Sequence, residues 1–181
     1  MIVPDRKDWT WVLERPCPEC GFEATKFPAP QVGEEARANA QIWRELLTSP
    51  SAATRTRPDR WSVLEYACHV RDVFRICSYR LDRMLTEDGP QYDNWDQDVT
   101  AIEDRYDQQD PATIAGEVVD AAAVIAARFE TVDVDAWSRT GFRSDGAQFT
   151  IETFAWYVIH DPMHHLWDVR DDAVASSVPP T

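Results

Sequence analysis

Two histidines, His160 and His164, lie one helical turn apart inside the apolar run 154–167. At this spacing two imidazoles project from the same face of a helix, with their Cβ atoms roughly 5–6 Å apart. The run therefore predicts a helix that carries two imidazoles on one face. The same spacing suits chelation of a single divalent metal ion.

The sequence contains only four histidines, and their distribution favours a shared site. His69 lies in an amphipathic segment about ninety residues upstream of the pair, so it could supply a third ligand from a neighbouring helix. His165 points about 100° away from the pair and is expected to support a ligand or to face solvent. Asp161 and Asp168 lie one turn from His165 and His164, respectively. These carboxylates either orient an imidazole or are solvated surface groups.

Size and charge exclude several classes of protein. The chain has 181 residues, of which 44% are hydrophobic, which is enough for one core and too short to make two domains expected. Its formal net charge of −14 opposes binding to nucleic acid or anionic lipid. There is neither a secretory signal nor a long apolar run. We expect a cytoplasmic domain acting on a small molecule, and the sequence leaves a homodimer open.

Apolar residues recur at helical spacing in four segments, which predicts an all-α fold. The expected helices cover 33–48, 62–85, a third segment that opens at Asp110-Pro111, and 150–172. Ser62 followed by Glu65 is typical of a capping box, Asp110 with Pro111 of a helix start, and Thr150 of an N-cap. The pairs Trp61 with Tyr66 and Phe149 with Phe154 have the spacing of a hydrophobic staple at their helices.

The connections complete the expected architecture. The acidic stretch 91–110 is longer than an ordinary connection and is expected to cross the bundle and carry part of a pocket. The stretch 131–148 reads as a loop with at most a short extended piece, and no strands of consequence are expected. The predicted fold is a four-helix bundle with a long crossover between helices two and three. An irregular arm (1–31) precedes this bundle (32–172), and a flexible tail (173–181) follows it.

The four cysteines divide into two pairs. Cys68 and Cys77 lie on different faces of the second helix and are most simply small buried hydrophobic residues. Cys17 and Cys20 form a Cys-Pro-Glu-Cys-Gly turn with the shape of a zinc knuckle. A closed zinc site needs four ligands, and only half are present in this segment. The turn could also be a redox pair or purely structural, so the sequence assigns it no function.

In a helical bundle, metal ligands are side chains that turn inward from facing helices. We therefore expect His69 on the second helix to meet His160 and His164 on the fourth. Three protein ligands leave positions open for water or substrate, which is typical of a catalytic centre. Zinc and nickel are the favoured ions, with iron and manganese as alternatives. Pro162 lies between the paired histidines, so either the helix kinks there and aims both rings at one point, or it breaks.

Trp61 followed eight positions later by His69, together with the late His160 and His164, resembles the pattern of the DinB-like superfamily of four-helix metalloproteins. The resemblance covers roughly residues 33–172. It implies a divalent metal ion held by the three histidines. The superfamily includes S-transferases that use mycothiol or bacillithiol and a mycothiol-dependent maleylpyruvate isomerase. The resemblance thus implies transfer of a low-molecular-weight thiol to an electrophilic small molecule.

A metal ion with open positions would lower the pKa of a bound thiol beside an electrophile. Trp61 and Trp156, together with Trp167, could line such a pocket, although aromatic residues at this spacing also serve as plain core. The competing hypothesis is a hydrolase that uses metal-bound water, with Asp72 or Asp161 as its base. A metal-stabilised binding module without enzymatic activity is the third hypothesis.

Overall fold

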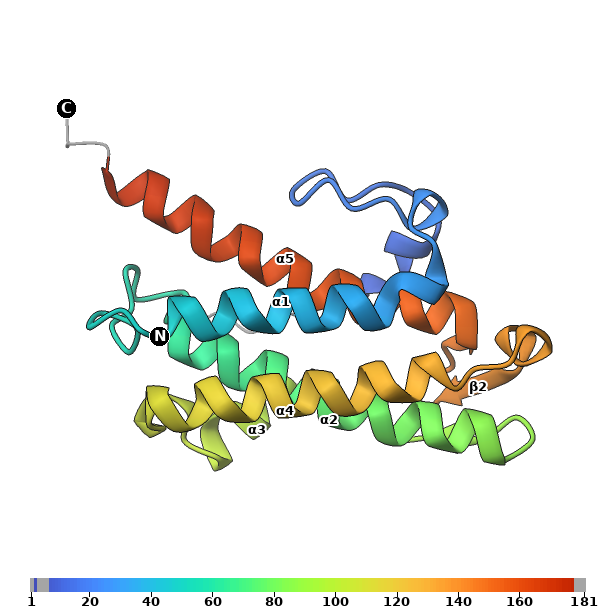
Figure 1. Cartoon of the computed structure of the whole chain (residues 1–181). Helices are drawn as coiled ribbons and strands as arrows, with labels where there is room; N and C mark the ends of the chain where they lie inside the picture. The colour runs from blue at the N-terminus through green and yellow to red at the C-terminus, as the bar shows by residue number, and fades with distance from the viewer. Residues whose placement is uncertain (1, 3–6, 178–181) are drawn as a thin grey trace.

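The computed structural model describes the backbone of residues 2 and 7–177 and the side chains of residues 2 and 7–170. Over this part of the chain it contains five α-helices, four of which form a bundle (Figure 1). Their bounds are α1 (Val32–Leu46), α2 (Val63–Thr86), α3 (Gln97–Glu103), α4 (Pro111–Glu130) and α5 (Ile151–Ser177). The expected four-helix bundle is confirmed. The expected crossover is also present, since the long connection between α2 and α4 contains the short helix α3.

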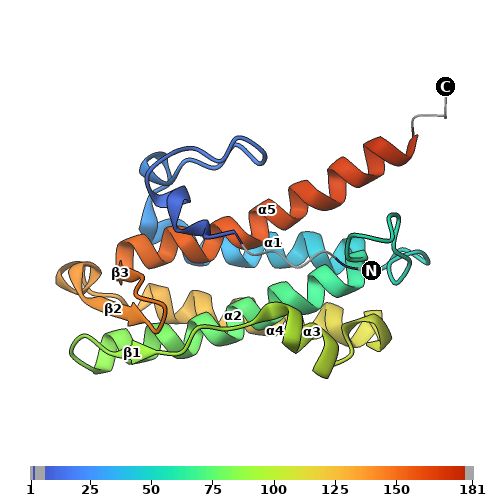
Figure 2. The same cartoon turned by 180° about the vertical axis from the view of Figure 1, so that it is seen from behind.

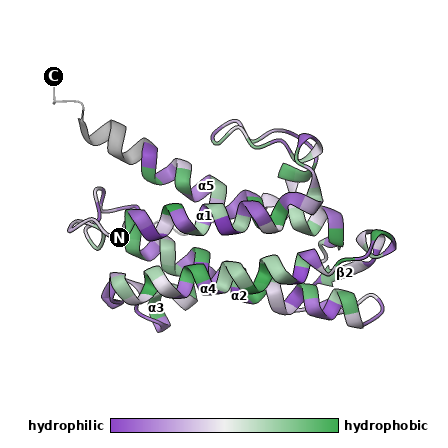
Figure 3. Cartoon of the chain, viewed as in Figure 1, coloured by the Kyte–Doolittle hydropathy of each residue, from purple (hydrophilic) through white to green (hydrophobic). Residues whose placement is uncertain are grey.

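Each long helix packs against two others. Helices α1 and α2 both pack against α4 and against α5, so α2 and α5, which carry the histidines, are neighbours. Each of these helices carries both hydrophobic and hydrophilic residues along its length, as expected for amphipathic helices (Figure 3). The largest fully buried side chains come from several helices and include Trp43, Phe74, Ile125 and Ile159. No helix in the described part of the chain is both long enough and apolar enough to cross a membrane.

Local signals start the helices where the sequence indicates. The Ser62 hydroxyl accepts a hydrogen bond from the Glu65 amide, and the Glu65 carboxylate accepts one from the Ser62 amide at 2.9 Å, which completes the capping box of α2. The Asp110 carboxylate accepts a hydrogen bond from the Thr113 amide at 2.9 Å at the start of α4. The Thr150 hydroxyl accepts one from the Thr153 amide at 3.1 Å at the start of α5.

Helix α5 continues without interruption through Pro162 and extends to Ser177, so it does not break at the proline. A proline inside a helix removes one backbone hydrogen bond and costs about 3 kcal/mol or more. The surrounding packing has to offset this cost. The helix also reaches five residues beyond its expected end, and positions 178–181 of the expected flexible tail lie outside the described residues.

A small three-stranded sheet closes one end of the bundle, where the sequence indicated only a loop with a short extended piece. Strand β1 (Gln91–Tyr92) pairs in parallel with β2 (Thr140–Arg143), which pairs antiparallel with β3 (Gln148–Thr150). Gly141 of β2 packs so closely on α2 that an added Cβ would lie 2.7 Å from the Met84 Cγ. The sheet therefore fastens the connection after α4 to the end of α2.

The N-terminal arm runs along α5 and is anchored to it at two places (Figure 2). It contains short 3-10 helices at Trp9–Leu13, Ala24–Lys26 and Ala29–Gln31. The Trp156 indole on α5 donates a hydrogen bond to the Phe27 carbonyl at 2.8 Å. Closer to the N-terminus, the Trp9 ring packs against the imidazoles of His160 and His164 on α5. The arm is thus part of the surroundings of the histidine-bearing face.

Candidate metal centres

Two groups of metal-ligating side chains meet on helix α5. In each group, one donor atom per residue lies within 4.8 Å of the donor atoms of the other members. The first group, which we name the thiol–imidazole cluster, consists of Cys17, Cys20, His160 and His164. The second, which we name the histidine–aspartate cluster, consists of His69, Asp161 and His165. Each cluster takes an i, i+4 pair from α5, and the two pairs are offset by one residue.

In the thiol–imidazole cluster, the turn of the arm faces two rings of α5. The Cys17 sulfur lies 3.6 Å from Nδ1 of His164. The ring centroids of His160 and His164 are 5.2 Å apart. Nε2 of His164 lies 3.3 Å from the carboxylate of Glu19, which belongs to the same turn as the cysteines. Both nitrogens of His164 therefore face groups of the arm.

Burial keeps both imidazoles of this cluster neutral. It lowers the pKa of His160 to about 4, and the neighbouring His164 acts in the same direction. Burial also lowers the pKa of His164 and raises the pKa of Cys20 to about 12. A ring nitrogen of His160, Nε2, is buried and has no hydrogen-bond partner. Neutral imidazoles with free lone pairs are the form that binds metal ions.

In the histidine–aspartate cluster, the Asp161 carboxylate lies between two imidazoles from different helices. Its Oδ1 lies 3.2 Å from Nε2 of His69 and 3.6 Å from Nε2 of His165. On its other side, the His165 ring contacts Asp168, whose Oδ2 lies 2.9 Å from Nδ1. A carboxylate on the far nitrogen of an imidazole fixes the ring orientation and directs the other nitrogen toward a metal ion.

The neighbouring imidazoles lower the pKa of both carboxylates in this region. Burial by itself would raise the pKa of Asp161, but the neighbouring His69 and His165 hold it well below its usual range. Burial would likewise raise the pKa of Asp168, but its hydrogen bond with His165 and the nearby positive charges together lower it. Both carboxylates are therefore ionised at neutral pH. Two imidazoles and an ionised carboxylate form a plausible set of three ligands for a divalent ion.

Aromatic rings hold the two imidazoles of the histidine–aspartate cluster in place. The His69 ring, which is fully buried, stacks on Trp95 at a centroid distance of 5.3 Å and an interplanar angle of 6°. Trp61 packs on the same ring at 5.3 Å, and Tyr66 packs on His165 at 4.9 Å. Trp95 belongs to the crossover between α2 and α4, so this connection helps to build the site, as its length indicated.

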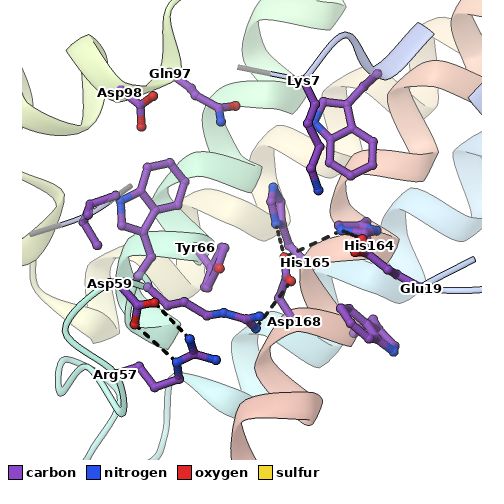
Figure 4. A pocket seen from close by; sticks show the side chains of 15 residues that line it. Lys7, Glu19, Arg57, Asp59, Tyr66, Gln97, Asp98, His164, His165 and Asp168 are labelled. Carbon is purple, nitrogen blue, oxygen red and sulfur yellow. Dashed lines mark hydrogen bonds and ion pairs between the residues drawn. The ribbon is translucent and has the colours of Figure 1, made fainter. Parts of the chain in front are cut away.

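Two cavities adjoin the clusters. The smaller one, of about 60 Å³, is lined by residues of both clusters together with Trp9, Gln97 and Tyr157. The larger one, of about 380 Å³, opens beside His164 and His165 and is shown in Figure 4. Its walls are formed by the arm, by the loop before α2, and by the helices α2, α3 and α5. Both acidic and basic side chains line these walls. The charged residues of this wall are Lys7, Glu19, Arg57, Asp59, Arg60, Asp98 and Asp168.

The three histidines expected to share one ion are divided between the two clusters. His160 and His164 do lie together, but they face the cysteines of the arm, whereas His69 lies with Asp161 and His165. From the sequence, His165 was expected only to support a ligand or to face solvent. Its i, i+4 relation to Asp161 was a usable signal, because it equals that of the paired histidines.

The other residues named from the sequence have different surroundings. Asp72 accepts hydrogen bonds from the Arg71 guanidinium and from the Tyr106 hydroxyl, the latter at 2.5 Å. Although burial would raise its pKa, these partners lower it, so Asp72 is a weak base. Trp61 lines the larger cavity. Trp156 instead holds the arm.

Comparison with known proteins identifies the family. The family profile of the DinB superfamily matches residues 30–169, which is most of the chain. A solved structure, YfiT from Bacillus subtilis, is similar over 90% of both chains, with a TM-score of 0.69 and 21% sequence identity. That protein is described as a probable metal-dependent hydrolase with an unusual four-helix bundle topology. No curated protein matches the sequence. The chain belongs to the DinB superfamily.

Proposed function

We propose that this protein is a metal-dependent hydrolase of small polar molecules, with the divalent ion held by His69, Asp161 and His165. The observation that carries the proposal is the convergence of Nε2 of His69, Oδ1 of Asp161 and Nε2 of His165. Two imidazoles with one carboxylate are a ligand set used in catalytic zinc sites, where a further position stays open. The description of YfiT as a probable metal-dependent hydrolase supports the same class of activity.

The residues around the cluster fit a bound ion. Asp168 contacts Nδ1 of His165, and a carboxylate in this position directs the other ring nitrogen toward a metal ion. Nε2 of His69 lies 3.2 Å from the Asp161 carboxylate, so this nitrogen is the one directed toward the proposed ion. When bound, the ion would supply Lewis acidity and lower the pKa of a coordinated nucleophile.

The smaller cavity has room for a water nucleophile beside the cluster. A buried water needs a cavity of about 10–15 Å³, and the cavity beside Asp161 and His165 measures about 60 Å³. The larger cavity, of about 380 Å³, falls within the range of small-molecule sites. Gln97, which lines both cavities, can orient a substrate there through its amide.

Thiol transfer is the second candidate. His165 lies in the wall of the larger cavity, so a low-molecular-weight thiol bound in that cavity could approach the same ion. The mixed charges of the wall suit a polar thiol such as mycothiol or bacillithiol. In this case the chain would need no nucleophile of its own, and the metal ligands would be unchanged.

The test compares metal-loaded protein with matched variants. The full chain would be stripped of metal, reloaded with zinc, nickel or manganese, and assayed with a panel of small esters and amides. A parallel assay would supply mycothiol or bacillithiol with an electrophile. We expect ester or amide turnover that is lost in His69→Ala and in Asp161→Asn. Asp82→Asn, which makes the same change at a partly exposed residue paired with Arg128, should keep it.

The two candidates give different results. Thiol consumption without ester or amide hydrolysis would replace the hydrolase proposal with thiol transfer. Full activity in Asp161→Asn, or in protein without bound metal, would contradict both candidates.

A further inference from the structure

We propose that Cys17, Cys20, His160 and His164 bind a zinc ion that fastens the N-terminal arm to α5. This site is distinct from the proposed catalytic centre and does not depend on it. Two thiolates and two imidazoles are a complete ligand set for a closed structural zinc site. Thiolate ligands select zinc over the harder ions that prefer oxygen.

The spacing of the donor atoms agrees with this geometry. All four donors lie within 4.8 Å of one another. In a tetrahedral site, Zn–S bonds of about 2.3 Å and Zn–N bonds of about 2.0–2.1 Å place a sulfur and a nitrogen ligand roughly 3.6 Å apart. The Cys17 sulfur already lies 3.6 Å from Nδ1 of His164. Only small movements of the remaining side chains would close the site.

The turn that carries the cysteines is held by its own backbone. The Cys17 amide donates to the Phe22 carbonyl at 2.8 Å, and the Gly21 amide donates to the Cys17 carbonyl at 3.0 Å. Gly21 has φ +77°, in the left-handed region that residues with side chains rarely adopt. This conformation brings the thiols of Cys17 and Cys20 to the same side, toward α5.

The imidazoles are arranged as ligands. Nδ1 of His164 faces Cys17, and its Nε2 lies 3.3 Å from the Glu19 carboxylate, which can orient the ring as carboxylates do beside metal-bound histidines. His160 is 3% exposed, and its Nε2 has no hydrogen-bond partner. A buried polar atom without a partner destabilises the folded state. A metal ion gives the His160 ring a partner.

Zinc binding would connect the arm to the proposed catalytic pocket. The thiol protons of Cys17 and Cys20 pass to solvent when the ion binds, which leaves two thiolates and two neutral imidazoles around it. The arm supplies Lys7, Trp9 and Glu19 to the wall of the larger cavity. Fixing the turn to α5 thereby fixes that wall. A Cys17–Cys20 disulfide is the competing outcome, and it would leave both imidazoles without this role.

The test measures zinc and its ligands in full-length protein purified under reducing conditions. The double variant His69→Ala/His165→Ala removes two of the three donors of the histidine–aspartate cluster. We expect it to keep about one equivalent of zinc, with X-ray absorption showing sulfur at about 2.3 Å and nitrogen at about 2.0–2.1 Å. In the otherwise unchanged chain, Cys17→Ser/Cys20→Ser should lose about one equivalent. Cys68→Ala, which removes a buried core thiol, should lose none.

A measurement without substitutions covers the case in which a variant fails to fold. In the zinc-loaded wild-type chain, Cys17 and Cys20 should resist alkylation until a chelator is added, whereas the reactivity of Cys68 should not change with the chelator. Zinc coordinated only by nitrogen and oxygen would overturn the proposal. So would full zinc content in Cys17→Ser/Cys20→Ser, or alkylation of Cys17 and Cys20 at equal rates with and without zinc.

Discussion

Replacing His160 with glutamine should remove a defined part of the acid sensitivity of the metal-free protein. Burial lowers the pKa of His160 from 6.5 to about 4 in the folded chain. At about 1.36 kcal/mol per pH unit, this difference corresponds to about 3 kcal/mol of folding free energy. Because the folded-state pKa is the lower one, this stability is fully present above pH 6.5. It is lost as the pH falls toward about 4, where the folded protein also takes up the proton.

The assay is urea unfolding of chelator-treated wild type and His160→Gln at several pH values between 7.5 and 4. The free energy of unfolding should fall more steeply for wild type, and the difference between the two proteins should change by about 3 kcal/mol over this range. Glutamine is polar and does not titrate, so it serves as the neutral reference. If the two proteins lost stability in parallel, the buried neutral state of His160 would be refuted.

Three further changes test the rest of the structure. Asp168→Asn should weaken metal binding at the histidine–aspartate cluster by about 10–100-fold, because the carboxylate contacts Nδ1 of His165 at 2.9 Å. Competition with a chelator would measure the metal affinity, and an unchanged affinity would count against the ligand set. Ile159→Ala should cost about 2–5 kcal/mol of unfolding free energy, because the side chain is fully buried; a loss well below this range in urea unfolding would show a loosely packed core. Ser62→Ala should cost about 0.5–2 kcal/mol, because the hydroxyl accepts a hydrogen bond from the Glu65 amide at the start of α2. Thermal unfolding at neutral pH measures this loss, and wild-type stability would argue against the capping box.

The helix starts could be predicted because their signals are local. Ser62, Asp110 and Thr150 each accept a hydrogen bond from a backbone amide three residues later in the chain. The sheet could not be predicted in the same way. Strand β1 contains only two residues, and its partners lie about fifty positions away in β2. Short strands of this kind depend on tertiary pairing and leave little alternation in the sequence.

The spacing of residues in the sequence also could not predict how the metal ligands divide between the two clusters. His160 with His164 and Asp161 with His165 have the same separation, and consecutive residues differ by about 100° around a helix. Which pair faces α2 and which faces the arm depends on the rotation of α5 about its axis, and the packing of the whole bundle sets that rotation. The contact between Cys17 and His164 spans 147 positions, so no local pattern reports it.

Because the arm forms part of the wall of the larger cavity, substitutions that alter this wall can be separate from substitutions that alter the helical bundle. The match to the superfamily begins at residue 30, whereas Lys7, Trp9 and Glu19 of the cavity wall precede it. Substitutions in this leading segment can alter which compounds fit while the helices keep their packing and their histidines. The selectivity of this protein can thus change through a segment that lies outside the part of the chain matched to the superfamily.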